Sequence, residues 1–212
     1  VPYFKKDTFG LPMNKVRQRG LNFDGDSWVE VIDDSSLGTM NSAFTCAFWY
    51  RHAEDVGTND YFWLVTKGVG HTPNADSGLG ISLYNNRIYA HLNTGDGQFQ
   101  SDFLISAASP SAPVWHYVTV TYDGDDLILY TNETSRESTA VTGNVSTTAE
   151  AYPLMIGHQY NNNGNNEARG VIDEVKWYDR ALSLAEVKKN YRATKSRHSS
   201  TSAWSDDFSD GF

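Results

Sequence analysis

The chain has 212 residues, of which 39% are hydrophobic and 13% aromatic, and this supply of apolar side chains excludes general disorder. Its formal net charge of −9 argues against a surface for nucleic acid, because phosphates would be repelled by the average field. No run of about 18 consecutive apolar residues is present, so the sequence predicts no membrane span. The length suits one large all-β domain with tails.

The first 20 residues are basic, with five Lys and Arg side chains against one Asp, and we interpret residues 1–20 as an N-terminal arm. From Leu21 onward, short runs of alternating apolar residues are separated by Gly, Asn, Asp and Ser. This pattern is typical of antiparallel strands in a β-sandwich. The clearest predicted strands are 28–32, 44–51, 61–67, 80–84, 87–93, 116–122, 127–131, 154–156 and 170–178.

Turn and capping signals divide these runs. Asn85-Asn86 predicts a two-residue hairpin, since Asn tolerates positive φ, and residues 123–126 predict a second turn. Helical patterning occurs once, where Ser183 and Glu186 have the spacing of a capping box. We therefore predict one short C-terminal helix that ends near Tyr191.

Three separate segments of the chain together match the pattern of one known domain family. They are 21–25 (Leu-Asn-Phe-Asp-Gly), 115–124 (Trp-His-Tyr-Val-Thr-Val-Thr-Tyr-Asp-Gly) and 170–183, which contains Ile-Asp-Glu-Val and Tyr-Asp-Arg-Ala-Leu-Ser. In combination they resemble the laminin-G-like and pentraxin-like domains of the concanavalin A-like lectin and glucanase superfamily. The resemblance implies a two-sheet antiparallel jelly-roll sandwich over residues 21–192, a frequent calcium site, and binding of carbohydrate or protein.

Acidic residues at both ends of the predicted sandwich are candidate calcium ligands. Asp24 lies in a turn and Asp173 in a late strand, so the two could converge on a hard cation with backbone carbonyls. The family pattern has a second Asp about three residues after the first, where this chain has Ser27, and Asp26 lies one position earlier. We predict a structural calcium ion held by Asp24, Asp26 and Asp173. The alternative is that Asp24 only caps its own turn.

Asp173 and Glu174 could also be taken for the carboxylate pair of a glycosidase on the same fold. A retaining pair needs its carboxyl groups about 5 Å apart on one face. Adjacent residues of a regular strand point to opposite faces, which argues against this interpretation. Because no other catalytic motif is present, we predict that the chain is not an enzyme.

The predicted strand 87–93 alternates between apolar and polar side chains. With the apolar side in the core, the other side would present a cation, an aromatic ring, an imidazole and an amide on an open sheet surface. Such a mixture suits a sugar, because the ring can stack while hydroxyl groups take directed hydrogen bonds. The candidate ligand-binding residues are Arg87, Tyr89, His91 and Asn93. An ordinary solvated strand face is an equally good interpretation.

Residues 159–167 form the most polar uncharged stretch of the chain, and loops of this kind can lie at a ligand-binding rim. Its candidate ligand contacts are Tyr160, Asn162 and Asn165. Asn132 and Asn144 lie in N-glycosylation triplets, which the sequence leaves open as modification sites.

Residues 193–212 lack periodicity and are rich in Ser and Asp, so we interpret them as a tail. Trp204, Phe208 and Phe212 recur every four residues among acidic side chains, so a helical turn would gather them on one side. Exposed aromatic side chains of this kind are costly unless they dock. We therefore predict that this tail docks on a partner or on a neighbouring copy of the chain.

These observations together predict a non-catalytic recognition module, secreted or displayed on a surface, that binds a glycan or an extracellular protein. The first alternative is a structural subunit of an extracellular or viral assembly, which contacts its neighbours through the two terminal segments. The second alternative is a glycan-active enzyme on the same fold.

Overall fold

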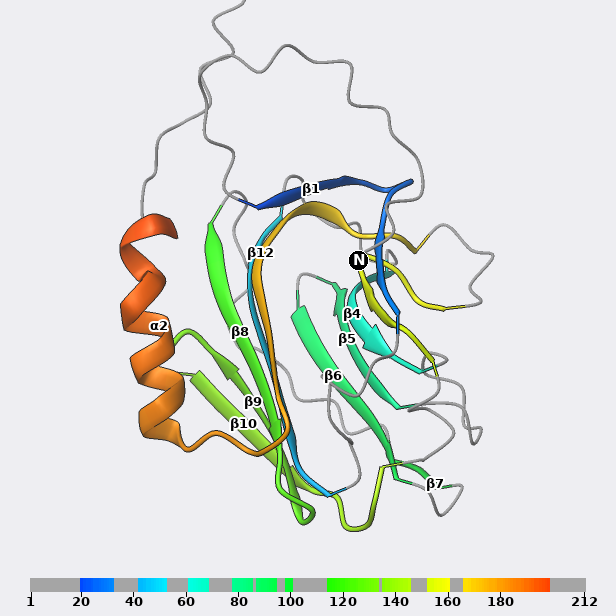
Figure 1. Cartoon of the computed structure of the whole chain (residues 1–212), viewed down its shortest axis with the longest axis vertical. Helices are drawn as coiled ribbons and strands as arrows, with labels where there is room; N and C mark the ends of the chain where they lie inside the picture. Colours follow the sequence, from blue (N-terminus) through cyan, green and yellow to red (C-terminus); the bar gives the residue numbers. More distant parts are fainter. Residues whose placement is uncertain are drawn as a thin grey trace, which may run out of the picture.

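The computed structural model describes residues 20–32, 42–52, 61–68, 78–85, 87–94, 98–100, 114–133, 135–145, 152–160 and 166–198. These residues form two six-stranded sheets, in which every pairing between neighbouring strands is antiparallel. The two sheets face each other, as Figure 1 shows, and the predicted all-β sandwich is confirmed. A single α-helix is described, α2 (Leu184–His198).

The first sheet has the strand order β1-β12-β3-β8-β9-β10 and the second has the order β2-β11-β4-β5-β6-β7. The predicted strands are all present within one residue of their expected ends, and β1, β7 and β10 are additional. Their bounds are β1 (Leu21–Asp24), β2 (Val29–Val31), β3 (Phe44–Arg51), β4 (Tyr61–Lys67), β5 (Leu79–Tyr84), β6 (Arg87–Thr94), β7 (Gln98–Gln100), β8 (Trp115–Tyr122), β9 (Asp126–Thr131), β10 (Ser135–Ala140), β11 (Leu154–Ile156) and β12 (Arg169–Tyr178).

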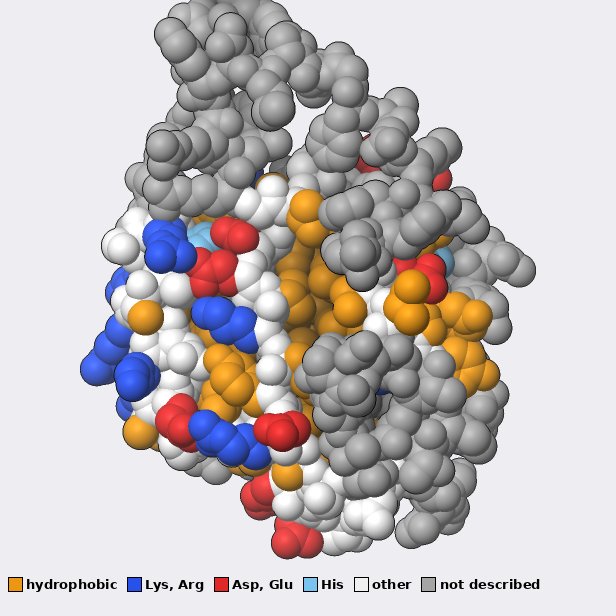
Figure 2. All heavy atoms as spheres, in the orientation of Figure 1, with side chains coloured by type: hydrophobic (Ala, Val, Ile, Leu, Met, Phe, Trp, Pro, Cys, Tyr) orange, Lys and Arg blue, Asp and Glu red, His pale blue; other side chains and the backbone are white. Residues whose placement is uncertain are grey.

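The core lies between the sheets and follows from strand alternation. In β3, for example, Phe44, Cys46, Phe48 and Tyr50 are buried in the main apolar cluster. Figure 2 shows hydrophobic side chains between the two sheets and charged side chains on the outside. Cys46 carries a free thiol whose pKa burial raises to about 12, so it behaves as the small buried hydrophobe that the sequence predicts.

Helix α2 lies against the outer face of the first sheet (Figure 1). Tyr191 packs on Trp49, with ring centroids 5.5 Å apart, and Val187 belongs to a separate cluster with Tyr130 and Leu182. These contacts bury the apolar side of the helix, which is how most helices in globular proteins gain their stability. The helix covers the outer face of the first sheet. Among the described residues, no helix covers the outer face of the second sheet.

The predicted capping box opens this helix. The Ser183 hydroxyl accepts a hydrogen bond from the Glu186 backbone N–H at 3.4 Å, and the Ser183 N–H donates to the Glu186 carboxylate at 2.9 Å. Arg180 also binds Glu186, with 2.7 Å between nitrogen and oxygen. The Arg180 guanidinium, with the Ser183 hydrogen bonds, lowers the pKa of Glu186 to about 2.

The helix continues through His198, so the predicted end near Tyr191 and the start of the tail at residue 193 are wrong. In the last two turns the buried side chains are Thr194 and His198, which are polar. Apolar periodicity therefore stops before the helix does. The Trp49 indole N–H donates to the Thr194 hydroxyl at 2.8 Å, and this hydrogen bond keeps the polar turn against the sheet.

Strand β12 contains a bulge at its centre. Asp173 lies opposite Trp49 and Lys176 opposite Ala47, so β12 uses one residue more than β3 over this interval. Glu174 takes up the extra residue with a φ of 52°, which is unusual for a side chain other than glycine. Regular alternation of side chains is broken at this point.

Candidate functional site

The outer face of the second sheet carries a continuous group of aromatic side chains from β4, β5 and β6. Leu83 and Ile88 are opposite each other and buried in the core, so residues next to them point outward. The outward group is Tyr61, Trp63, Ser82, Tyr84, Tyr89 and His91, which we call the aromatic face. Antiparallel pairing of β4 with β5 and of β5 with β6 places these side chains together.

One half of the aromatic face is buried. Trp63 is 0% exposed and lies over Gly80, where an added Cβ would be 2.7 Å from its ring. His91 is 4% exposed, and its Nε2 lies 3.1 Å from the Tyr61 hydroxyl and 3.2 Å from the Ser82 hydroxyl. Asn93, further along β6, is 1% exposed. The prediction that His91 and Asn93 lie on an open surface is therefore wrong.

The other half of the aromatic face is accessible. Tyr61, Tyr84 and Tyr89 are each partly exposed, and we call them the tyrosine cluster. The Tyr84 ring centroid lies 5.9 Å from that of Tyr61 and 6.1 Å from that of Tyr89. Arg87 is exposed at the same end of the face. Tyr89 and Arg87 thus lie on the outward face, as the sequence predicts. Tyr61 of β4 and Tyr84 of β5 lie beside them, although the alternation of those strands did not mark them as site residues.

The end of the asparagine-rich stretch 159–167 contacts β4, the strand that carries Trp63. The Trp63 backbone N–H donates to the Asn166 carbonyl at 2.9 Å, and Glu167 forms an isolated bridge with Trp63. Tyr160 is partly exposed and contacts Tyr152, with ring centroids 5.1 Å apart. Asn162 and Asn165 lie outside the described residues, so their contact with a ligand stays a prediction.

The predicted calcium ligands are not brought together. Asp24 lies opposite Arg169 in the β1–β12 pair, and Asp173 is four residues further along β12, about 13 Å away at the rise of a strand. The Asp24 carboxylate accepts hydrogen bonds from the Asp26 backbone N–H at 3.1 Å and from the Ser27 hydroxyl at 2.9 Å. Asp24 therefore caps its own turn, and calcium binding near Asp24 and Asp26 stays a prediction.

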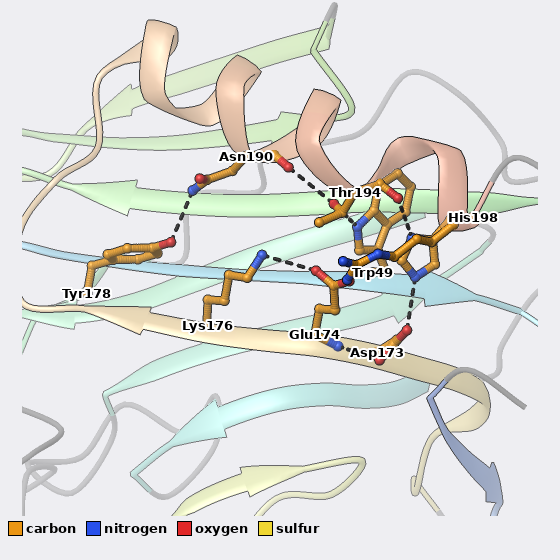
Figure 3. A network of polar contacts seen from close by, with 9 residues as sticks. Trp49, Asp173, Glu174, Lys176, Tyr178, Asn190, Thr194 and His198 are labelled. Carbon is orange, nitrogen blue, oxygen red and sulfur yellow. Dashed lines mark hydrogen bonds and ion pairs between the residues drawn. The ribbon is translucent and has the colours of Figure 1, made fainter. Parts of the chain in front are cut away.

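A second polar site lies between β12 and the end of α2 (Figure 3). The β12 bulge places Asp173 and Glu174 on the same side of the strand, with His198 of the helix beside them. One ligand atom from each of the three lies within 4.8 Å of the others. The argument that adjacent residues must point to opposite faces is wrong here, because it assumed a regular strand.

The hydrogen bonds of His198 define the electrostatics of this site. Its Nδ1 lies 3.1 Å from the Thr194 carbonyl and its Nε2 lies 3.0 Å from the Asp173 carboxylate. The Thr194 carbonyl and the Asp173 carboxylate are both hydrogen-bond acceptors. The His198 side chain is 0% exposed and stacks on Trp49, with centroids 4.2 Å apart. We call the Asp173, Glu174, Thr194 and His198 group, with Trp49, the clasp.

Glu174 is bound by two cations. Its carboxylate lies 3.1 Å from the Lys176 amine and 2.9 Å from the Arg197 guanidinium. Burial alone would raise the pKa of Glu174, but the hydrogen bonds and charges of Lys176, Arg197 and His198 lower it below its usual range. Glycoside hydrolysis needs one carboxyl group that holds a proton for the leaving group. The Glu174 carboxylate is instead stabilised in the ionised form, and the pair attaches α2 to β12 through Arg197 and His198.

The remaining predicted residues are not all within the described structure. The residues predicted to dock, Trp204, Phe208 and Phe212, lie outside the described residues, and docking stays a prediction. Asn132, in one glycosylation triplet, uses its side-chain oxygen to accept from the Tyr117 backbone N–H at 3.0 Å. Neither Tyr61 nor Tyr84 was predicted as a site residue. The Asn85-Asn86 hairpin signal, which pairs Tyr84 with Arg87, could have identified Tyr84.

The chain was compared with protein families and with characterised and solved proteins. A family model described as the concanavalin A-like lectin/glucanases superfamily matches residues 23–188. None of the curated protein sequences compared with the chain matches it. Within the described residues, no helix has the length and apolar character needed to cross a membrane.

Several solved structures share the fold. The binding domain of Paraclostridial mosquitocidal protein 1 is 21% identical with a TM-score of 0.63, over 82% of this chain and 42% of that one. The receptor-binding domain of the botulinum neurotoxin C/D mosaic serotype is 15% identical with a TM-score of 0.65, over 91% and 46%. A structure of botulinum neurotoxin type C, whose cell entry depends on two ganglioside molecules, is 15% identical with a TM-score of 0.58, over 81% and 41%. The chain matches less than half the length of each.

Proposed function

This chain belongs to the concanavalin A-like lectin/glucanase superfamily, and we propose that it is a non-catalytic module that binds carbohydrate at the tyrosine cluster. The observation that carries the proposal is the group of three partly exposed tyrosine rings on one end of the second sheet. A sugar ring has an apolar face that stacks on such rings, and their hydroxyl groups are both donors and acceptors.

The buried half of the aromatic face supports this role because it fixes the position of the rings. Tyr61 packs edge-on against Trp63 with centroids 4.9 Å apart, and its hydroxyl lies within hydrogen-bond distance of His91. A preorganised surface loses little side-chain freedom when it binds, which favours affinity. The tyrosine cluster is thus held in place before a ligand arrives.

The clasp supports the non-catalytic part of the proposal. Its two carboxylates are tied to His198, Lys176 and Arg197, so they serve to attach α2 to β12. The structural neighbours are binding domains, and one of those toxins depends on ganglioside for cell entry, which also favours recognition of a glycan. We place the module outside the cell or on a surface, where such glycans are met. A calcium ion near Asp24 and Asp26 remains part of the proposal.

Glycan-array binding of the wild-type chain and of Tyr84→Ala and Tyr89→Ala variants tests the proposal. Each Ala variant should lose about tenfold in affinity, because a stacked aromatic ring contributes about 1 kcal/mol beyond the area it buries. The matched controls, Tyr84→Phe and Tyr89→Phe, keep the rings and should retain most of the binding. A chain that binds no glycan on the array, or Ala variants that bind as the wild type does, would overturn the proposal. Repeating the array with a chelator tests the calcium ion separately.

A further inference from the structure

We infer that the tyrosine cluster selects sugars that carry a negative charge, through the guanidinium of Arg87. This inference rests on the proposed carbohydrate-binding function and names the class of ligand. The anionic group is a carboxylate or a sulfate on the sugar, since both present coplanar or clustered oxygens to a guanidinium.

The position of Arg87 follows from the hairpin between β5 and β6. Tyr84 and Arg87 are opposite each other across the two-residue turn, in which Asn85 has a φ of 50°. Cross-strand partners have their Cβ atoms about 5 Å apart and on the same face. Tyr89 follows Arg87 by two residues, so its side chain is on that face as well. The cation is therefore a neighbour of two rings of the tyrosine cluster.

Arg87 has no counter-charge among the described residues, and its side chain is exposed. Three other exposed arginines, Arg180, Arg192 and Arg197, differ in this respect. Nitrogen–oxygen distances of 2.7 Å, 2.6 Å and 2.9 Å join Arg180 to Glu186, Arg192 to Glu133 and Arg197 to Glu174. In a chain with a net charge of −9, a cation beside two tyrosines that has no carboxylate partner among the described residues is suited to an anion from outside.

The tyrosine rings and the Arg87 guanidinium would contact different parts of the sugar. The tyrosine rings stack on the apolar face of the sugar, which does not distinguish charged from neutral sugars. The guanidinium donates two parallel hydrogen bonds to one anionic group, and such charge-assisted bonds are about twice as strong as neutral ones. Because Arg87 is exposed, its contribution is screened by salt, whereas stacking is not.

The test compares two probes that differ in one group: an oligosaccharide ending in glucuronic acid and the same oligosaccharide ending in glucose. A third probe, ending in 6-sulfated glucose, separates sulfate from carboxylate. Titration calorimetry of the wild-type chain should show about tenfold tighter binding to at least one charged probe than to the neutral one, and the difference should shrink at high salt. The charged probe that binds more tightly identifies the anion.

Arg87→Ala and Arg87→Gln should remove this preference, so that each variant binds the charged and the neutral probes with equal affinity. The matched control is Lys189→Ala, which removes an equal charge from exposed α2 on the other side of the sandwich, and the preference should survive it. Equal affinity of the wild type for charged and neutral probes, or a preference that persists in both Arg87 variants, would overturn the inference while leaving the carbohydrate proposal intact. If none of the three probes binds and no array glycan binds, the proposed function itself is wrong.

Discussion

Gly80 is a single residue on which the whole aromatic face depends. The Trp63 ring lies so close that a Cβ at position 80 would be 2.7 Å from the ring carbon Cζ3. The ring is fully buried and has no room to retreat. Gly80→Ala should therefore lower the free energy of unfolding by about 1–3 kcal/mol, as overpacked core sites do, measured by urea denaturation.

The origin of that loss can be checked with a second substitution. Trp63→Leu removes the ring that the added methyl group would strike, so the Gly80→Ala penalty should fall by about 1 kcal/mol or more in the Trp63→Leu background. Additive effects of the two substitutions would show that the contact does not set the cost.

In the aromatic face, the alternation along β6 predicts the direction of each side chain but not its burial. The pattern correctly separates the core side from the outward side, because side chains of a strand point alternately to its two faces. It does not say whether an outward side chain is covered. His91 and Asn93 are outward and buried, whereas Tyr89 and Arg87 are outward and accessible. Burial of an outward residue depends on the remainder of the fold.

At the scale of secondary-structure elements, the clasp joins α2 to β12. His198→Ala removes a fully buried ring from between Trp49 and Trp115 and breaks its hydrogen bond with the Asp173 carboxylate. We expect the free energy of unfolding to fall by about 2–4 kcal/mol. Amide hydrogen exchange in the last turns of α2 should also accelerate.

Arg197→Ala is the matched comparison for this variant. Arg197 belongs to the same network, but its side chain is 58% exposed, so its ion pair with Glu174 is screened by water. Its removal should cost no more than about 1 kcal/mol. A His198→Ala variant as stable as Arg197→Ala would show that the clasp is not what attaches the helix.

These two elements also mark where sequence patterns stop being informative. The start of α2 is predictable because a capping box has a defined spacing of residue types. Its end is not, because Thr194 and His198 are buried through polar contacts with Trp49 and Asp173. The β12 bulge is equally hidden, since the residue with positive φ is Glu174 and not a glycine.

At the scale of the whole molecule, the architecture was more predictable than the site. Many short alternating runs allow few solutions other than two stacked sheets, and the β3, β4 and β11 bounds were predicted to the residue. The site requires residues of three strands to lie together. Local sequence patterns do not determine the order of strands in a sheet, so the site could not be predicted from them. Asp24 and Asp173 lie on neighbouring strands, but the register separates them, so the predicted convergence of the two is wrong.

The free energy of unfolding of the whole fold should decrease in two stages as the pH is lowered. Burial lowers the pKa of His116, so the unfolded chain binds a proton there more readily below about pH 6.5. The stability due to neutral His116 is present above that value and is lost as the pH falls through the range between the two pKa values. Burial also lowers the pKa of His158, so this residue adds to the same stage against the opposing charge of Glu167.

Glu174 contributes to the second stage, because its folded pKa is lowered and its contribution is therefore lost below about pH 4.3. Each group contributes a slope of at most about 1.4 kcal/mol per pH unit, measurable by urea denaturation at a series of pH values. His116→Phe should flatten the first stage without affecting the second, and Glu174→Gln should do the reverse. An unchanged slope between pH 6.5 and 5 in His116→Phe would mean that the burial of this imidazole does not cause the first loss.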